Sequence, residues 1–160
     1  MAWWKLLTAN LRKVQKLSWS ERWLLVQAFW LLPLTALSLH CLGLRRICDI
    51  SARWHPPPQN PGGDSEQLLC RAFSTAQLVQ AAARYGLCSP KCLSKSLVLW
   101  WLLKRQGIPG VLRIGVSPLG ERLEAHAWVE FQGVVLNDSD DVHQRYAPFH
   151  GDILGRQPGL

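Results

Sequence analysis

Cys92, His126 and Asp138 are the residues whose types and order could carry out covalent chemistry. The cysteine lies in the segment 89–93, the histidine follows 34 residues later, and the aspartate comes 12 residues after the histidine. A thiol followed by an imidazole and a carboxylate fits a nucleophile, the base that activates it and the group that orients the base. The three residues therefore form a candidate catalytic site.

The position of Cys92 on a helix start strengthens this interpretation. Ser89 can act as N-cap and Pro90 as the first helical residue, which would make Cys92 the third. The free amides and the positive end of the helix dipole favour a thiolate there, and the neighbouring lysines, Lys91 and Lys95, act in the same direction. The alternative is a small buried residue that packs under the sheet.

The register of the following hairpin decides whether Asp138 reaches His126. A two-residue turn at Gln132 and Gly133 would leave His126 opposite Ser139 and Asp138 on the wrong face. A three-residue loop over residues 131–133, with a left-handed glycine, sets His126 directly across from Asp138. The triad therefore predicts the three-residue, bulged loop.

Other readings of these residues remain open. His126 could be a surface histidine on a half-exposed sheet, and Asp140 and Asp141 compete with Asp138 for its role. Cys88 and Cys92 with His126 could supply three zinc ligands, but the partner cysteines of a typical zinc site are missing. We therefore expect neither a metal nor a cofactor.

The elements around the candidate site are two helices followed by three strands. A capping box at residues 74–77 predicts a helix that ends at Gly86, and a second, nearly all-apolar helix carries Cys92 and ends before Gly107. Alternating side chains then predict strands over residues 111–116, 123–131 and 134–138. Helices followed by an antiparallel sheet predict an α+β fold, in which a central Cys-bearing helix packs on the sheet.

The front of the chain is basic and rich in tryptophan. Residues 1–54 hold six of the nine tryptophans, and eight Lys and Arg against two acidic residues. Such a segment suggests anionic lipid headgroups or an acidic partner, and the alternative is a helical cap with a solvated basic face. We expect no nucleic-acid partner.

Residues 23–44 form an uncharged run within this front segment. A capping box at residues 18–21 starts a helix, and the 22 uncharged residues are long enough to span a bilayer. Pro33 should break or kink that helix, so a helix pair folded on the domain or lying in the membrane surface fits as well. No cleavable signal is evident, and five irregularly spaced cysteines favour reduced thiols. We expect a cytoplasmic protein, with membrane association left open.

A segment rich in proline and glycine divides the chain. Residues 55–64 contain four prolines and two glycines, which cannot sustain a helix or a central strand. We therefore expect a helical appendage over residues 1–54, a linker over 55–64, and a domain over 65–160 that carries the chemistry.

Five motifs together resemble a known family. They are KCLSKSL at 91–97, GIP at 107–109, RIGV at 113–116, AHAWVE at 125–130 and VVLND at 134–138. In combination they resemble the B protein of lasso-peptide biosynthesis, in particular its transglutaminase-like half, which occurs as a separate chain. The resemblance covers about residues 65–142, and the basic front segment is similar in character.

The resemblance implies a papain-like cysteine peptidase with a transglutaminase-like topology. Cys92 would be the nucleophile, His126 the general base and acid, and Asp138 the orienting residue. The substrate would be the leader region of a ribosomally made precursor, presented by a separate leader-recognition protein, and an ATP-dependent cyclase would then close the ring. The chain itself carries no glycine-rich phosphate loop.

Two other functions stay open. A transglutaminase-type acyl transferase would use the same thioester and pass the acyl group to an amine instead of water. A membrane-surface adaptor would keep the scaffold without catalysis, and its basic helices would dock a biosynthetic complex.

Overall fold

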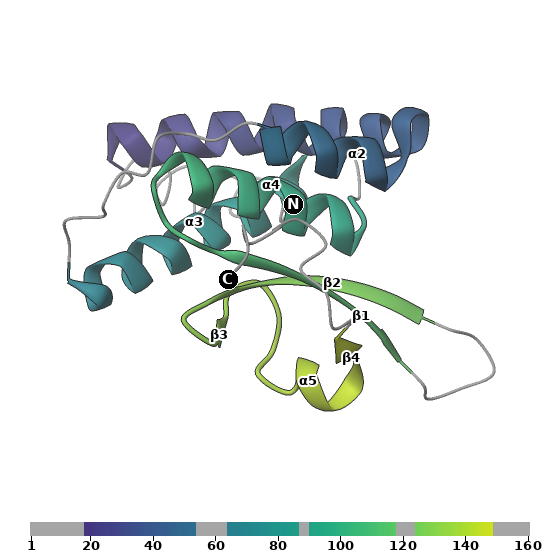
Figure 1. Cartoon of the computed structure of the whole chain (residues 1–160). Coiled ribbons are helices and arrows are strands. Elements are labelled where there is room, and N and C mark those ends of the chain that lie inside the picture. Colours follow the sequence, from purple (N-terminus) through teal and green to yellow (C-terminus); the bar gives the residue numbers. More distant parts are fainter. Residues whose placement is uncertain (1–17, 54–63, 87–89, 118–123, 149–160) are drawn as a thin grey trace, which may run out of the picture.

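The computed structural model describes residues 18–53, 64–86, 90–117 and 124–148, which form stacked layers (Figure 1). Helix α2 lies across α3 and α4, these helices cover one face of the sheet, and α5 lies on the other face. The predicted α+β fold is confirmed. The elements are α2 (Trp19–Arg53), α3 (Ser65–Tyr85), α4 (Cys92–Arg105), β1 (Val111–Ser117), β2 (Glu124–Phe131), β3 (Val134–Val135), α5 (Val142–Arg145) and β4 (Ala147–Pro148).

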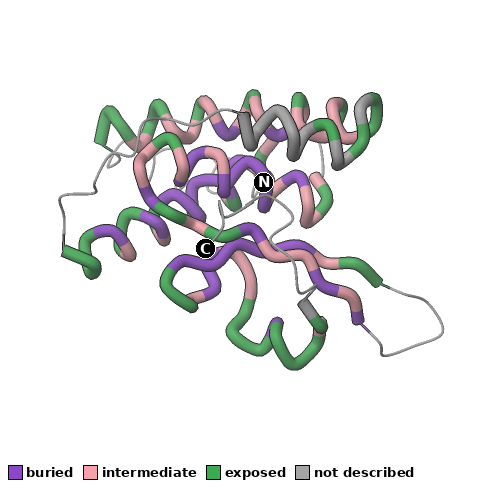
Figure 2. The backbone as a smooth tube through the Cα atoms, viewed as in Figure 1, coloured by how far each residue is buried: buried purple, intermediate pink, exposed green. Residues whose placement is uncertain are grey.

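The sheet has the strand order β3-β2-β1-β4, and all its neighbours are antiparallel. Alternate residues of β2 enter two different cores. Val129 and Phe131 join Leu112 and the buried residues of α4, whereas Trp128 joins a small cluster with Val142 of α5. Figure 2 shows how burial concentrates on α4 and β2. Both faces of β2 are therefore covered, one by helices and one by the C-terminal segment.

Helix α4 starts later than predicted. Lys91 has an extended backbone with ψ 162° and acts as N-cap, so the first helical hydrogen bond runs from the Lys95 N–H to the Lys91 carbonyl at 3.2 Å. Cys92 is thus the first residue of the helix and not the third, and the proposed cap Ser89 lies outside the described residues. The end at Arg105, followed by Gly107 with φ 73°, agrees with the prediction.

Helix α3 is longer than predicted, because the capping box at residues 74–77 does not start it. The helix runs without interruption from Ser65, and Thr75 lies in its middle with its hydroxyl bonded to the Arg71 carbonyl at 2.9 Å. Apolar residues at helical spacing, Leu68, Ala72 and Ala76, are buried along the whole length. This continuous apolar face overrides the local capping signal. The predicted end at Gly86 is confirmed.

Helix α2 begins at its predicted capping box. The Glu21 carboxylate accepts from the Ser18 N–H at 2.7 Å, and the Ser18 hydroxyl accepts from the Glu21 N–H at 3.3 Å. Of the predicted break or kink at Pro33, the break does not occur, because the helix continues through Pro33 and breaks at Gly43 instead, with φ 74° and ψ 163°. That backbone conformation is essentially restricted to glycine. The result is two helices joined at Gly43.

The front helix shares the main core of the molecule. Ala28 and Leu32 of α2 are buried with residues of α3 and α4. Most of the predicted linker, residues 55–63, lies outside the described residues, and the division of the chain at this linker stays a prediction.

The hairpin between β2 and β3 has the shorter of the two loops considered. Phe131 pairs with Val134 across a two-residue turn, in which Gln132 has φ 51° and Gly133 has φ 80°. The predicted three-residue loop is therefore wrong. The strand predicted over residues 134–138 is also too long, because β3 ends at Val135. No pattern in the sequence predicted α5 and β4.

The turn makes a testable prediction. Because Gln132 is left-handed, Gln132→Gly should relieve strain and raise the free energy of unfolding by about 0.5 kcal/mol, measured by urea denaturation. Gly133→Ala is the matched control and should lower it by about 1 kcal/mol. In a three-residue loop residue 132 would be right-handed, so a loss of stability in Gln132→Gly would contradict the observed register.

Candidate active site

A histidine and a carboxylate meet at the centre of the candidate site. The Nε2 of His126 and the Oδ2 of Asp138 share a hydrogen bond, and both side chains are about one-fifth exposed, at 20% and 19%. A carboxylate only accepts, so Nε2 carries the proton of this bond. In a neutral imidazole the other nitrogen, Nδ1, is then the acceptor and is left for a further partner.

Three residues donate hydrogen bonds to the carboxylate of Asp138. Besides His126, the Ser139 N–H donates to Oδ1 at 2.8 Å and the Arg145 guanidinium donates to it at 3.0 Å. Burial by itself raises the pKa of Asp138, but these hydrogen bonds and the nearby positive charge outweigh it and lower that pKa. The folded pKa lies below the unfolded one, so this stabilisation is complete above the ordinary Asp range and is lost as the pH falls through the lowered pKa.

Two aromatic rings fix the plane of the imidazole. The His126 ring stacks on Tyr146 at 4.8 Å between centroids, and more distantly on Trp128 at 6.2 Å. The Trp128 indole N–H donates to Glu130 Oε1 at 2.6 Å. The ring is therefore held by contacts on its face as well as by the bond at its edge.

Glu130 is a buried carboxylate that ties the surrounding elements together. Its Oε2 lies 3.3 Å from Arg113 Nε on β1, and its Oε1 lies 3.2 Å from His143 Nε2 on α5. These partners compensate the cost of burying the charge. Glu130 thus fixes Trp128 and α5 against the sheet beside His126.

Asn137 brings Asp138 to His126 after β3 has ended. The Leu136 N–H still donates to the Val129 carbonyl at 2.9 Å, but the next pairing bond is made by a side chain, since the Val129 N–H donates to Asn137 Oδ1 at 2.8 Å. The chain bends at this point, and Asp138 reaches the imidazole from beyond the edge of β2. Contact is therefore made by a bend and not by the strand pairing that the sequence predicted.

The same asparagine ties this bend to α4. Asn137 Nδ2 donates to Ser96 Oγ at 2.9 Å, and the Ser96 hydroxyl donates to the Ala127 carbonyl at 2.8 Å. Ser96 is fully buried. We call this set of hydrogen bonds, which joins Asn137, Ser96, Ala127 and Val129, the Asn137 clamp.

The clamp places Cys92 near the beginning of β2. Cys92 lies four residues before Ser96, one turn earlier on the same side of α4. Further along α4, Leu103 lies near Val129, since a Cβ on Gly110 would be 3.0 Å from Leu103 and 3.3 Å from Val129. Helix α4 therefore runs in the same direction as β2. Its first turn lies toward the N-terminal end of β2, where His126 is.

The imidazole stands on the α5 face of the sheet, whereas α4 covers the other face. A contact between the Cys92 thiol and the imidazole would run around the edge of β2, which is unpaired there because β3 ends at Val135. No hydrogen bond joins Cys92 to His126 in the described part of the chain. Such contacts are often longer before a substrate binds.

The backbone around Cys92 is that of a helix start. As the first residue of α4 it lies beside the N–H groups of the first turn, which have no carbonyl partner within the helix. Its side chain is half-buried, whereas Cys41 and Cys70 are exposed. The later start of the helix thus leaves Cys92 at the positive end of the dipole.

The two aspartates that could have replaced Asp138 as the orienting residue, Asp140 and Asp141, lie away from the imidazole. The Asp141 carboxylate binds Arg145 at 3.2 Å, and neither it nor the exposed Asp140 contacts the imidazole. Among the described residues no three His, Cys, Asp or Glu side chains gather to hold a metal ion. Cys88, part of the zinc alternative, lies outside those residues.

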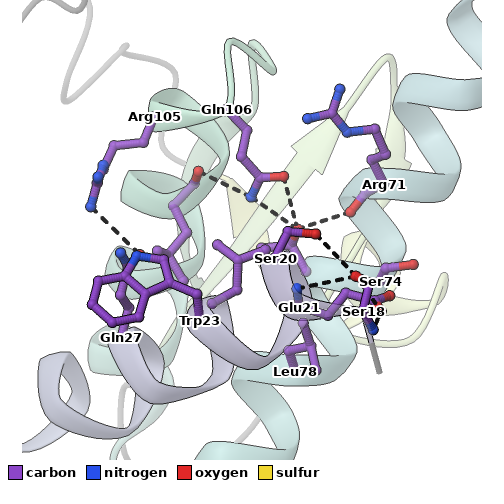
Figure 3. Close-up of a pocket in the computed structure, with 13 residues that line it drawn as sticks. Ser18, Ser20, Glu21, Trp23, Gln27, Arg71, Ser74, Leu78, Arg105 and Gln106 are labelled. Carbon is purple, nitrogen blue, oxygen red and sulfur yellow. Dashed lines mark hydrogen bonds between the residues drawn. The ribbon is translucent and has the colours of Figure 1, made fainter. Parts of the chain in front are cut away.

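A cavity of about 590 Å³ lies at the other end of α4 (Figure 3). It is lined by Trp23 and Gln27 of α2 and by Arg105 and Gln106 at the end of α4. Thirteen residues separate Cys92 from Arg105, which is about 20 Å of helix. This cavity is therefore separate from the candidate site.

Several supporting residues were not identified from the sequence. Ser96, Trp128 and Asn137 lie inside the motifs KCLSKSL, AHAWVE and VVLND, but none of them was given a role. The spacing of Ser96 four residues after Cys92 is a usable signal. Tyr146 and Arg145 lie in a tail without periodicity, so no local pattern indicates them.

The Asn137 clamp should make a measurable contribution to the free energy of unfolding. Asn137→Ala leaves the Val129 N–H without its acceptor and the Ser96 oxygen without the donor from Asn137, and should lower the free energy of unfolding by about 1–3 kcal/mol. Gln80→Ala is the matched control, because it removes an exposed amide that bonds only the Asn137 carbonyl, at 3.1 Å. Denaturant titration checks both. Equal free energies of unfolding for Asn137→Ala and Gln80→Ala would show that the clamp does not stabilise the fold.

Comparison with known proteins agrees with this architecture. A family described as the transglutaminase-like superfamily matches residues 31–150, a range that includes Cys92, His126 and Asp138. Neither a curated protein nor a solved structure matches the chain. The family is usually enzymatic, with chemistry of the cysteine-peptidase or acyl-transferase type. From the extent of the match, three quarters of its length, the chain belongs to the transglutaminase-like superfamily.

Proposed function

We propose that the protein is a cysteine peptidase that removes the leader from a ribosomally made lasso-peptide precursor. Membership of the superfamily supports the reaction type. The combined motifs around Cys92, His126 and Asp138, which resemble the lasso-peptide B protein, support the substrate.

One observation carries the proposal. His126 lies on β2, which the Asn137 clamp joins to the first turns of α4, close after Cys92, and its partner Asp138 lies in the bend beside Asn137. A base held by its orienting carboxylate, together with a thiol at a helix start, is the set of groups that an activated sulfur nucleophile needs.

The reaction follows from the roles of these groups. His126 takes the thiol proton on Nδ1 while Asp138 keeps Nε2–H oriented and stabilises the imidazolium. The thiolate attacks the scissile carbonyl, the imidazolium donates its proton to the departing amine, and a thioester remains. Water, deprotonated by His126, then releases the leader and regenerates the thiol.

The start of α4 supplies one donor for the developing oxyanion. The Cys92 N–H is the first in the helix and has no intrahelical acceptor. An amide in this position can stabilise the negative oxygen of the tetrahedral intermediate.

The proposal includes three partners. They are the leader region of the precursor, a separate leader-recognition protein that presents it, and the ATP-dependent cyclase that uses the freed core peptide.

A cleavage assay tests this function. With a matched precursor and its recognition protein, Cys92→Ala should lower the cleavage rate by at least about 1000-fold, because the nucleophile is lost. Asp138→Asn should also slow it strongly, because the imidazole loses its orienting carboxylate. Cleavage is followed by mass spectrometry.

Cys70→Ala is the matched control, since it removes an exposed thiol on α3 and should cleave at the unaltered rate. Cleavage by Cys92→Ala at the rate of the unaltered protein would exclude the mechanism. A cross-linked product formed with loss of ammonia, in place of two fragments with gain of water, would show acyl transfer instead of hydrolysis.

A further inference from the structure

Helix α2 exposes a continuous row of apolar side chains. Trp19, Trp23, Val26, Trp30, Leu34 and Leu37 are between 47% and 83% exposed, and we call them the outer α2 row. Between residues 23 and 37 every exposed side chain of α2 belongs to this row. Soluble helices place polar residues at such positions.

The spacing puts the row on a single face of the helix. Successive members are separated by four, three, four, four and three residues, which is the helical repeat. Ala28 and Leu32 point to the opposite side, where they are buried against α3 and α4. The row therefore forms a convex ridge along the outside of the molecule, where Figure 1 shows α2 as the outermost layer.

The packing of α2 argues against a transmembrane span. By length and composition Trp19–Cys41 could cross a membrane. The same helix contacts α3 and α4 along its inner face, and crossing a bilayer would withdraw Ala28 and Leu32 from the core. The fold is compatible with a helix that lies parallel to a membrane surface.

The charges around the outer α2 row indicate which kind of surface it would bind. Arg22 lies between the first two members of the row and Arg46 follows its last member, both exposed, and residues 23–44 carry no formal charge. Residues 1–54 as a whole hold eight basic against two acidic side chains. Basic groups at both ends of an apolar, tryptophan-rich ridge match a bilayer with anionic headgroups, in which tryptophan favours the interface.

We infer that the outer α2 row is a membrane-docking surface, which inserts in the plane of an anionic bilayer to the depth of the headgroups. A convex, uncharged ridge needs no specific pairing from a bilayer, whereas a protein partner would have to offer a matching groove. The layer order then keeps the sheet, with His126 and Asp138, on the side away from the lipid (Figure 1).

Vesicle flotation of the full chain tests the inference. The protein should float with vesicles of phosphatidylcholine and phosphatidylglycerol at 7:3, and at least tenfold less with phosphatidylcholine alone or in 0.5 M salt. A variant with Trp30→Gln, Leu34→Gln and Leu37→Gln should reduce the floated fraction at least tenfold. These side chains are exposed, so its circular dichroism should be unaltered.

The matched control replaces exposed apolar residues elsewhere, Tyr85→Gln and Val111→Gln, and should float like the unaltered protein. Absence of flotation in the unaltered protein, or equal flotation of the triple variant, would overturn the inference. Absence of flotation together with a dimer that the triple variant dissociates would assign the row to a protein interface instead. Peptidase activity is not the readout, so the result is independent of the proposed function.

Discussion

The carboxamide of Asn137 is the constraint on which the rest of the site depends. Its oxygen accepts the Val129 N–H in place of a strand partner, and its nitrogen donates to Ser96, which in turn bonds the Ala127 carbonyl. Three elements are joined through one side chain: the Cys-bearing helix, the His-bearing strand and the bend that carries Asp138. Because these groups are buried or half-buried, an unmade bond would cost more than an exposed one, so their arrangement is well determined.

The early end of β3 has a structural consequence in this arrangement. A strand that continued to Asp138 would occupy the edge of β2 and separate α4 from the α5 face, where the imidazole lies. By ending at Val135, the strand opens the edge at the point where the first turn of α4 arrives. The imidazole is then held from the other side by Tyr146, and Glu130 fixes Trp128 and α5 behind it.

Sequence patterns predicted correctly those features that neighbouring residues in the chain determine. The capping box at Ser18 starts α2, Gly107 follows the end of α4, and alternation on β2 correctly divides His126 from Ala127. Failures came where distant contacts decide: the core overrides the capping box at Ser74, and the Asn137 side chain replaces strand pairing. The two-residue turn places Gln132 in a conformation that its residue type does not favour, so no rule based on sequence would select it. The contact between His126 and Asp138 was predicted from their residue types, but it is made by a bend after β3 and not by the predicted strand pairing.

The central claim is that the clamp brings the Cys92 thiol within reach of the held imidazole. The most direct measurement is the rate of carboxamidomethylation of each cysteine by iodoacetamide at neutral pH, read by peptide mass spectrometry. Cys92 should react faster than the exposed Cys41 and Cys70, and His126→Ala or Asn137→Ala should remove that advantage. Rates that simply follow exposure, with Cys92 slower than Cys41 and Cys70 and insensitive to both substitutions, would contradict the account.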